Sequence, residues 1–81
     1  MLEQMTLSYD GTNSLRGYKD IPQGLNVSNA MVTYIPYTTV SYKISGPPLL
    51  SETNNKLSVK VNGSNFTASE TVTVLIMWFY K

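Results

Sequence analysis

The sequence contains no cysteine and no histidine among its 81 residues. Disulfide bonds are therefore excluded, and a zinc site would have to consist of carboxylates alone, which is an unusual ligand set. A chain of this length lies near the lower limit of what folds without such support, because small chains bury a smaller share of their surface. We expect residues 1–81 to form a single domain that is stabilised by association with further copies.

Charged residues are also scarce, with six basic and five acidic side chains and a net charge of +1. The basic residues are scattered, and the nearest approach to an aromatic and basic cluster is Tyr42-Lys43. Nucleic-acid binding requires a basic stripe that releases counterions from phosphates. We therefore expect no nucleic-acid partner. The basic residues are Arg16, Lys19, Lys43, Lys56, Lys60 and Lys81.

The usual catalytic arrangements are missing as well. The chain has no histidine that could act as the base to activate a serine. Neither a GxSxG sequence nor a phosphate-binding glycine loop occurs. The acidic residues stand in or beside turns and strand ends, and no spacing between them guarantees proximity. We expect no enzymatic activity, no cofactor and no metal. The acidic residues are Glu3, Asp10, Asp20, Glu52 and Glu70.

The amino-terminal segment MLEQMTLSYDG has neither a basic start nor an apolar core with a cleavage site, so we expect no secretory signal. The chain would then remain in the cytoplasm in which it is made, or leave it by assembly or cell lysis. The closing run VTVLIMWFYK, residues 72–81, is about half the roughly 20 residues that a helix needs to cross a bilayer. Its β-branched residues favour a strand, and membrane insertion is not expected.

Alternating apolar and polar residues predict strands in the first half of the chain. Residues 5–9 alternate and are followed by Asp10-Gly11, a turn signal. Residues 12–24 carry two glycines and a proline without a clear period, which indicates a connecting segment. Structure is expected to resume near residues 25–27.

The middle of the chain predicts two further runs. Val32 and Tyr34 share one face of the first, and residues 40–44 alternate in the second. Pro36 stands between them. Because proline cannot donate to a strand ladder, it marks a bulge, a sheet edge or a corner between sheets.

The last third predicts a strand, a turn and a final strand. Residues 51–56, SETNNK, form a polar loop in this interpretation, and residues 57–61, LSVKV, alternate so strictly that Ser58 should meet water. Asn62-Gly63 is the strongest hairpin signal, because a type I′ turn requires positive φ at both central positions. A four-residue connection at the same place fits equally well.

No stretch of ten residues has helical periodicity, and the chain contains no internal repeat. The pattern predicts five to seven strands, of which residues 71–80 form the last. We expect an all-β fold, either a compact antiparallel β-sandwich or a small barrel.

The final strand has two different faces. Side chains alternate across a strand, so residues 72, 74, 76, 78 and 80 form an apolar face that should be the core. The opposite face begins polar and becomes apolar at Leu75, Met77 and Phe79. One face of each strand in so small a fold normally meets solvent, so these three side chains require a cover.

Three covers are possible. Segment 12–24 could fold back and lay Leu15, Tyr18 and Ile21 across the strand, the same strand of further copies could pack there around a symmetry axis, or a different protein could do so. In the second case Leu75, Met77 and Phe79 are the interface of a homo-oligomer, and their burial at roughly 25 cal/mol per Å² would help to stabilise a marginal domain.

Tyrosines supply an alternative binding surface. Tyr34, Tyr37 and Tyr42 lie close together in sequence around the break at residue 36. Their rings and hydroxyl groups could bind a carbohydrate at a cell surface. Tyrosines at strand positions also commonly pack their rings and place their hydroxyl groups in water, and both interpretations remain open.

The short, cysteine-free chain is rich in Ser, Thr, Asn and Tyr, and the turn Asn62-Gly63 leads to a final strand ending VTVLIMWFYK. In these respects it resembles small β modules of tailed bacteriophages: tail-fibre tips, receptor-binding domains and accessory proteins. The resemblance implies a β-sandwich homo-oligomer, with a trimer expected, in a structural or host-attachment role. It implies contacts with other virion proteins or a cell-surface glycan, in the host cytoplasm during assembly and then in the virion. The chain departs from fibre proteins in lacking a shaft, since GPP at 46–48 occurs once.

Overall fold

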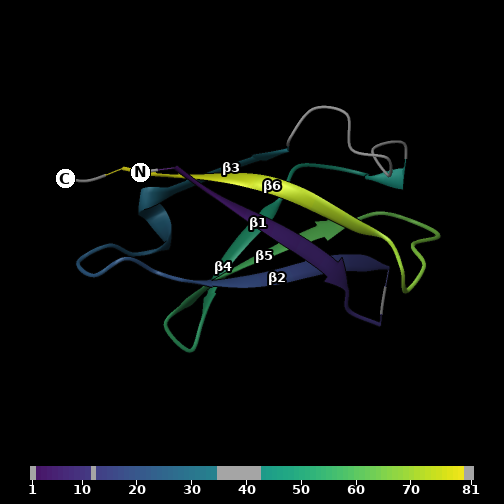
Figure 1. The fold of residues 1–81 in the computed structure, drawn as a ribbon, viewed down its shortest axis with the longest axis horizontal. Coiled ribbons are helices and arrows are strands. Elements are labelled where there is room, and N and C mark those ends of the chain that lie inside the picture. Colours follow the sequence, from purple (N-terminus) through teal and green to yellow (C-terminus); the bar gives the residue numbers. More distant parts are fainter. Residues whose placement is uncertain (1, 12, 35–42, 80–81) are drawn as a thin grey trace.

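The computed structural model describes residues 2–11, 13–34 and 43–79. Six strands form one antiparallel sheet in the order β3-β6-β1-β2-β5-β4. The sheet curls into a half-barrel, in which β1 crosses over β4 and β5 (Figure 1). The predicted all-β, antiparallel fold with five to seven strands is confirmed, and its architecture is a partly closed barrel.

The strands are short and are joined mainly by turns and loops. A 3-10 turn, η1, lies before β3 and contacts β4, the strand at the opposite edge of the sheet. The element bounds are β1 (Leu2–Tyr9), β2 (Ser14–Asp20), η1 (Val27–Asn29), β3 (Ala30–Tyr34), β4 (Leu49–Thr53), β5 (Lys56–Asn62) and β6 (Thr71–Trp78).

The core lies on the inner face of the curled sheet. Alternation places every second side chain there, and the predicted core face of the last strand is confirmed for residues 72 to 78, of which Trp78 is only 2% exposed. Phe66, in the loop before β6, is also buried. The buried apolar side chains are Met5, Leu7, Leu15, Leu57, Val59, Val61, Phe66, Val72, Val74, Ile76 and Trp78.

The prediction of a connecting segment at 12–24 was wrong, because β2 occupies most of it and pairs with both β1 and β5. Two residues hid the alternation. Gly17 stands at an inner position where a Cβ atom would lie 2.7 Å from Leu7 Cδ2, so a larger residue does not fit. Lys19 also stands at an inner position, where its Nζ pairs with Glu3 Oε2 at 3.4 Å.

The predicted loop at 51–56 was also wrong, because β4 and β5 meet there in a two-residue hairpin. Asn54 and Asn55 have φ values of 50° and 64°, as a type I′ turn requires. The hairpin predicted at Asn62-Gly63 does not form. Gly63 pairs instead with Ile44 in an isolated bridge, where a Cβ atom would clash with the Lys43 carbonyl oxygen.

The outer face of β5 is less exposed to solvent than its sequence pattern predicts. Ser58 is only 2% exposed, although it stands at an outer position. It is paired with Tyr18 on β2 and with Ser51 on β4, so neighbours flank it on both sides. The predicted run 40–44 lies largely outside the described residues, as does Pro36.

Candidate functional site

A row of apolar side chains crosses the outer face of three neighbouring strands. Met77 on β6 is paired directly with Met31 on β3 and with Leu2 on β1. Large fractions of these side chains meet solvent: 57% of Met31, 59% of Leu2 and 43% of Met77. Phe79, which follows β6 on the same side, is 47% exposed.

Leu75 extends the row by one position along β6 and is partly buried between Thr33 and Gln4, its register partners. We call Leu2, Met31, Leu75, Met77 and Phe79 the outer apolar patch. Beyond Leu75 the same face of β6 continues with Thr73 and Thr71, which are paired with Thr6 and Ser8. The face is therefore apolar at one end and polar at the other, as the alternation of the last strand predicts.

No charged side chain stands at an outer position of the described parts of β1, β3 and β6. Glu3, the charged residue of β1, points to the inner side, where its Oε1 accepts a 2.7 Å hydrogen bond from Trp78 Nε1. At the same end, the Phe79 amide donates to the Asn29 carbonyl oxygen at 2.8 Å. These two bonds fix the end of β6, so the patch is held on a well-supported backbone.

Segment 12–24 does not provide the intramolecular cover that the sequence left open. Leu15 is fully buried in the core, and Tyr18 lies on the outer face of β2, which β1 separates from β6. Ile21 packs against the core. The patch therefore remains exposed in the described part of the chain.

Sequence reasoning identified Leu75, Met77 and Phe79 but missed Leu2 and Met31. Both missed residues stand at outer positions, adjacent in sequence to residues of the inner face. Nothing in the local pattern shows that they flank Met77, because that depends on which strands become neighbours. The sequence shows that Leu2 and Met31 are apolar, but it does not show that they lie beside Met77.

Of the three tyrosines predicted as a ligand surface, the structure describes one. Tyr34 is partly buried, and its hydroxyl group donates a 2.7 Å hydrogen bond to the Gly46 carbonyl oxygen. Burial raises the pKa of Tyr34 above its usual value. This hydroxyl group is thus engaged within the chain, while Tyr37 and Tyr42 lie outside the described residues.

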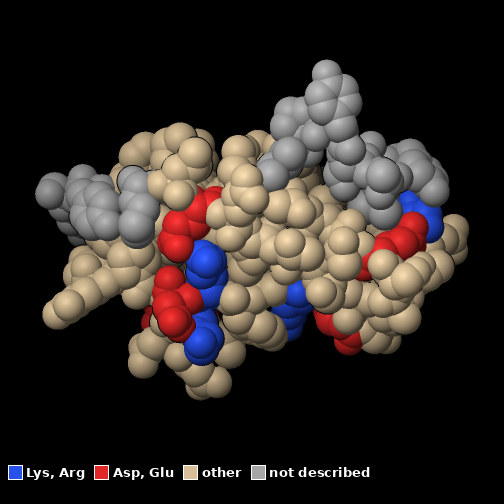
Figure 2. All heavy atoms as spheres, viewed as in Figure 1, with Lys and Arg blue, Asp and Glu red and all other residues tan. Residues whose placement is uncertain are grey.

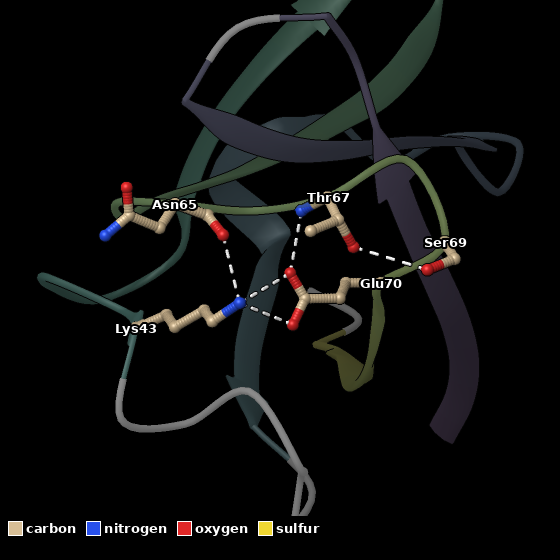
Figure 3. Close-up of polar contacts among 5 residues, drawn as sticks. All are labelled: Lys43, Asn65, Thr67, Ser69 and Glu70. Atoms are coloured by element: carbon tan, nitrogen blue, oxygen red, sulfur yellow. Dashed lines mark hydrogen bonds and ion pairs between the residues drawn. The ribbon is translucent and has the colours of Figure 1, made fainter.

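Lys43 and Glu70 form the best-connected ion pair of the described chain (Figure 3). Lys43 Nζ lies 2.8 and 2.7 Å from the two carboxylate oxygens and also donates to the Asn65 carbonyl oxygen at 2.9 Å. The Thr67 amide donates to Glu70 Oε1 at 2.7 Å. The hydrogen bond from Lys43 and then that from Thr67 lower the pKa of Glu70. The cluster ties the chain at Lys43 to the loop before β6, which is a structural role.

On the face shown in Figure 2, acidic and basic side chains lie next to one another and most of the surface carries neither charge. Among residues 2–11, 13–34 and 43–79, no three acidic side chains come together as metal ligands would. Within the same ranges, no helix has the length and apolar character needed to cross a membrane. Comparison with protein-family models, curated proteins and solved structures finds no match to this chain.

Proposed function

We propose that this protein is a non-enzymatic structural or interaction module that assembles with copies of itself through the outer apolar patch. The observation that carries the proposal is the exposed row Leu2, Met77 and Met31 on a face without charged side chains. Full burial of a large apolar side chain contributes about 1.5–3 kcal/mol, so covering one that is half exposed contributes about 1 kcal/mol.

The edge of the sheet beside the patch supports a second copy as the occupant. β3 is an edge strand, and its sequence AMVTY contains neither a charged residue nor proline. Edge strands of proteins that remain monomeric are commonly protected by charge, proline or a bulge. An edge strand whose own sequence lacks such protection, next to a face that is exposed among the described residues, favours association through both features.

The resemblance of the sequence to small modules of tailed bacteriophages supports a tail-associated, receptor-binding or accessory role. It sets the expected number of copies at three, with the patches facing a common axis. Other virion proteins are expected partners on the remaining surface. The host cytoplasm during assembly, and then the virion, are the expected locations.

The test is the mass of the protein in solution, measured by light scattering on a sizing column for the wild type, Met77→Glu and Thr73→Glu. Both variants place a carboxylate on the outer face of β6, but only Met77 belongs to the patch. We expect a wild-type oligomer that Met77→Glu dissociates and Thr73→Glu leaves intact. Circular dichroism should show that both variants remain folded. A monomeric wild type, or equal effects of the two substitutions, would refute the proposal.

A further inference from the structure

Two basic side chains stand directly opposite each other on the outer face of β2 and β5, where β2 pairs with the end of β1 that lies away from Leu2 of the outer apolar patch. Arg16 is the register partner of Lys60. Like charges at such positions are separated by roughly 5 Å at Cβ and repel each other. The ion pairs of the described chain use the other lysines: Lys19, Lys43 and Lys56. Arg16 and Lys60 therefore have no carboxylate partner among the described residues.

The Arg16 guanidinium group also has hydrogen-bond donors that are not fully used. Its Nε atom is shielded from solvent and has no hydrogen-bond acceptor. Its Nη1 atom reaches only the Tyr18 hydroxyl group, at the long distance of 3.5 Å. A guanidinium group offers donors in a fixed fork that matches a carboxylate. The site thus combines an unbalanced double positive charge with a guanidinium group whose terminal nitrogens make a single long hydrogen bond within the described chain.

An exposed aromatic ring lies beside these cations. Tyr18 follows Arg16 by two residues, so both stand on the same face, roughly 7 Å apart along β2. Tyr18 is 51% exposed and lines a depression together with Thr53, Asn54 and Lys56 at the β4–β5 hairpin. Tyrosine, threonine and asparagine supply an apolar ring face with hydroxyl and amide groups around it.

Asp20 determines which anion fits. Its carboxylate pairs with Lys56 at 2.8 Å, and the Asp20 side chain is 88% exposed. An exposed carboxylate accepts hydrogen bonds from sugar hydroxyl groups but repels a phosphate backbone. Nucleic acid also requires a run of basic side chains along its path, and only Arg16 and Lys60 are unbalanced here. The chemistry favours a ligand with one carboxylate, many hydroxyl groups and an apolar ring face.

We propose that the outer face of β2 and β5 binds an acidic saccharide, with Arg16 and Lys60 holding a sugar carboxylate and Tyr18 stacking on the adjacent pyranose ring. Asn54, Thr53 and Asp20 bind the hydroxyl groups at the hairpin end. The site uses none of the residues of the outer apolar patch and does not depend on the proposed assembly. It also differs from the tyrosine surface around residue 36.

The probe is a glucuronosyl-glucose disaccharide, which carries one carboxylate, and its methyl ester is the uncharged control. Binding to the full chain is followed by amide chemical shifts and calorimetry, for the wild type, Arg16→Gln, Tyr18→Ala and Lys19→Gln. Lys19→Gln is the control for Arg16→Gln, because it also removes one positive charge from β2. Lys19 is next to Tyr18 in sequence but points to the inner face, away from the proposed site. We expect saturable binding of the acid, weakened about tenfold in Arg16→Gln and Tyr18→Ala and unchanged in Lys19→Gln. The ester should bind at least about tenfold more weakly than the acid.

Thermal unfolding separates loss of the site from loss of the fold. Lys60→Gln removes one of two positive charges that repel each other, so its melting temperature should be no lower than that of the wild type. Its affinity for the acid should nevertheless fall. The proposal is overturned if the wild type does not bind the acid saturably, or if the ester binds equally well. It is also overturned if Lys19→Gln weakens binding as much as Arg16→Gln, or if a thymidine oligonucleotide binds more tightly than the acid.

Discussion

Met31 and Met77 face each other across β3 and β6, and solvent reaches about half of each side chain. Because the chain contains no cysteine, one introduced thiol per chain can form a disulfide only between copies. We expect Met77→Cys to form covalent dimers under mild oxidation and Thr73→Cys to form few. The ratio of dimer to monomer on a non-reducing gel measures this. Equal yields from the two variants would mean that the patch is not where copies meet.

Gly17 is expected to be intolerant of a larger residue. A Cβ atom there would lie 2.7 Å from Leu7 Cδ2 and 3.0 Å from Met5 Sδ. Alanine favours a strand over glycine by roughly 0.5–1 kcal/mol, but overpacking beside the fully buried Leu7 costs about 1–3 kcal/mol. Gly17→Ala should therefore lower the free energy of unfolding in urea. Gly46→Ala is the control, because nothing lies within 4 Å of its Cβ position, and a similar loss there would contradict the crowding argument.

The turn between β4 and β5 should depend on residues that accept positive φ. Asn55 has a φ of 64°, a conformation that costs a β-branched residue about 1–2 kcal/mol. We expect Asn55→Val to lower the free energy of unfolding by about that amount and Asn55→Gly to preserve or raise it. Chemical denaturation measures both variants. Equal stability of Val and Gly at this position would exclude the two-residue turn.

The ion pair of Lys43 and Glu70 should make stability depend on pH. The hydrogen bond from Lys43 lowers the pKa of Glu70 in the folded chain below its usual value. A carboxyl group with a lowered folded pKa stabilises the fold above its unfolded pKa, and this contribution is lost as the pH falls through the folded pKa. The stability difference between the wild type and Lys43→Gln should thus be largest at neutral pH and shrink in acid.

The matched control for this pH dependence is Lys60→Gln, which removes a lysine without a carboxylate partner among the described residues. Its stability difference from the wild type should change little between neutral and acidic pH. Asp20, whose pKa is lowered chiefly by a hydrogen bond from Lys56, titrates in all three proteins and cancels in the comparison. A difference for Lys43→Gln that stays constant with pH would contradict a stabilising role for the Glu70 carboxylate.

The strands that could be predicted from the sequence are those whose alternation is uninterrupted. β6 and β5 have unbroken inner rows, so their core faces could be identified before any fold was known. β2 could not, because Gly17 leaves an inner position empty of a side chain and Lys19 fills another with a charge. Both exceptions have tertiary causes: Leu7 occupies the space above Gly17, and Glu3 pairs with Lys19.

Turn signals were less reliable, since the same residue types serve different purposes. Gly63 is required because another chain segment approaches it closely, whereas a hairpin signal assumes that it supplies positive φ. Asn54 and Asn55 do adopt positive φ, yet a polar sequence around them resembles an ordinary loop. The outer apolar patch could be predicted only in part. The sequence showed that Met77 is an apolar residue on the outer face of the last strand. It did not show that Met31 and Leu2 are its neighbours, because that depends on the order of the strands in the sheet.

The position of β6 in the sheet also has a kinetic consequence. β6 is the last strand along the chain, yet it lies between β3 and β1, which both precede it. Until β6 is inserted, β3 has no partner strand in the sheet. The core-facing side chains of β1 are then uncovered on the side where β6 will pair. Pairing across such sequence separations is slow, because loop closure must precede the contacts that reward it. The half-barrel should therefore close late, in one cooperative step, and the most apolar segment of the chain should be the last to leave water.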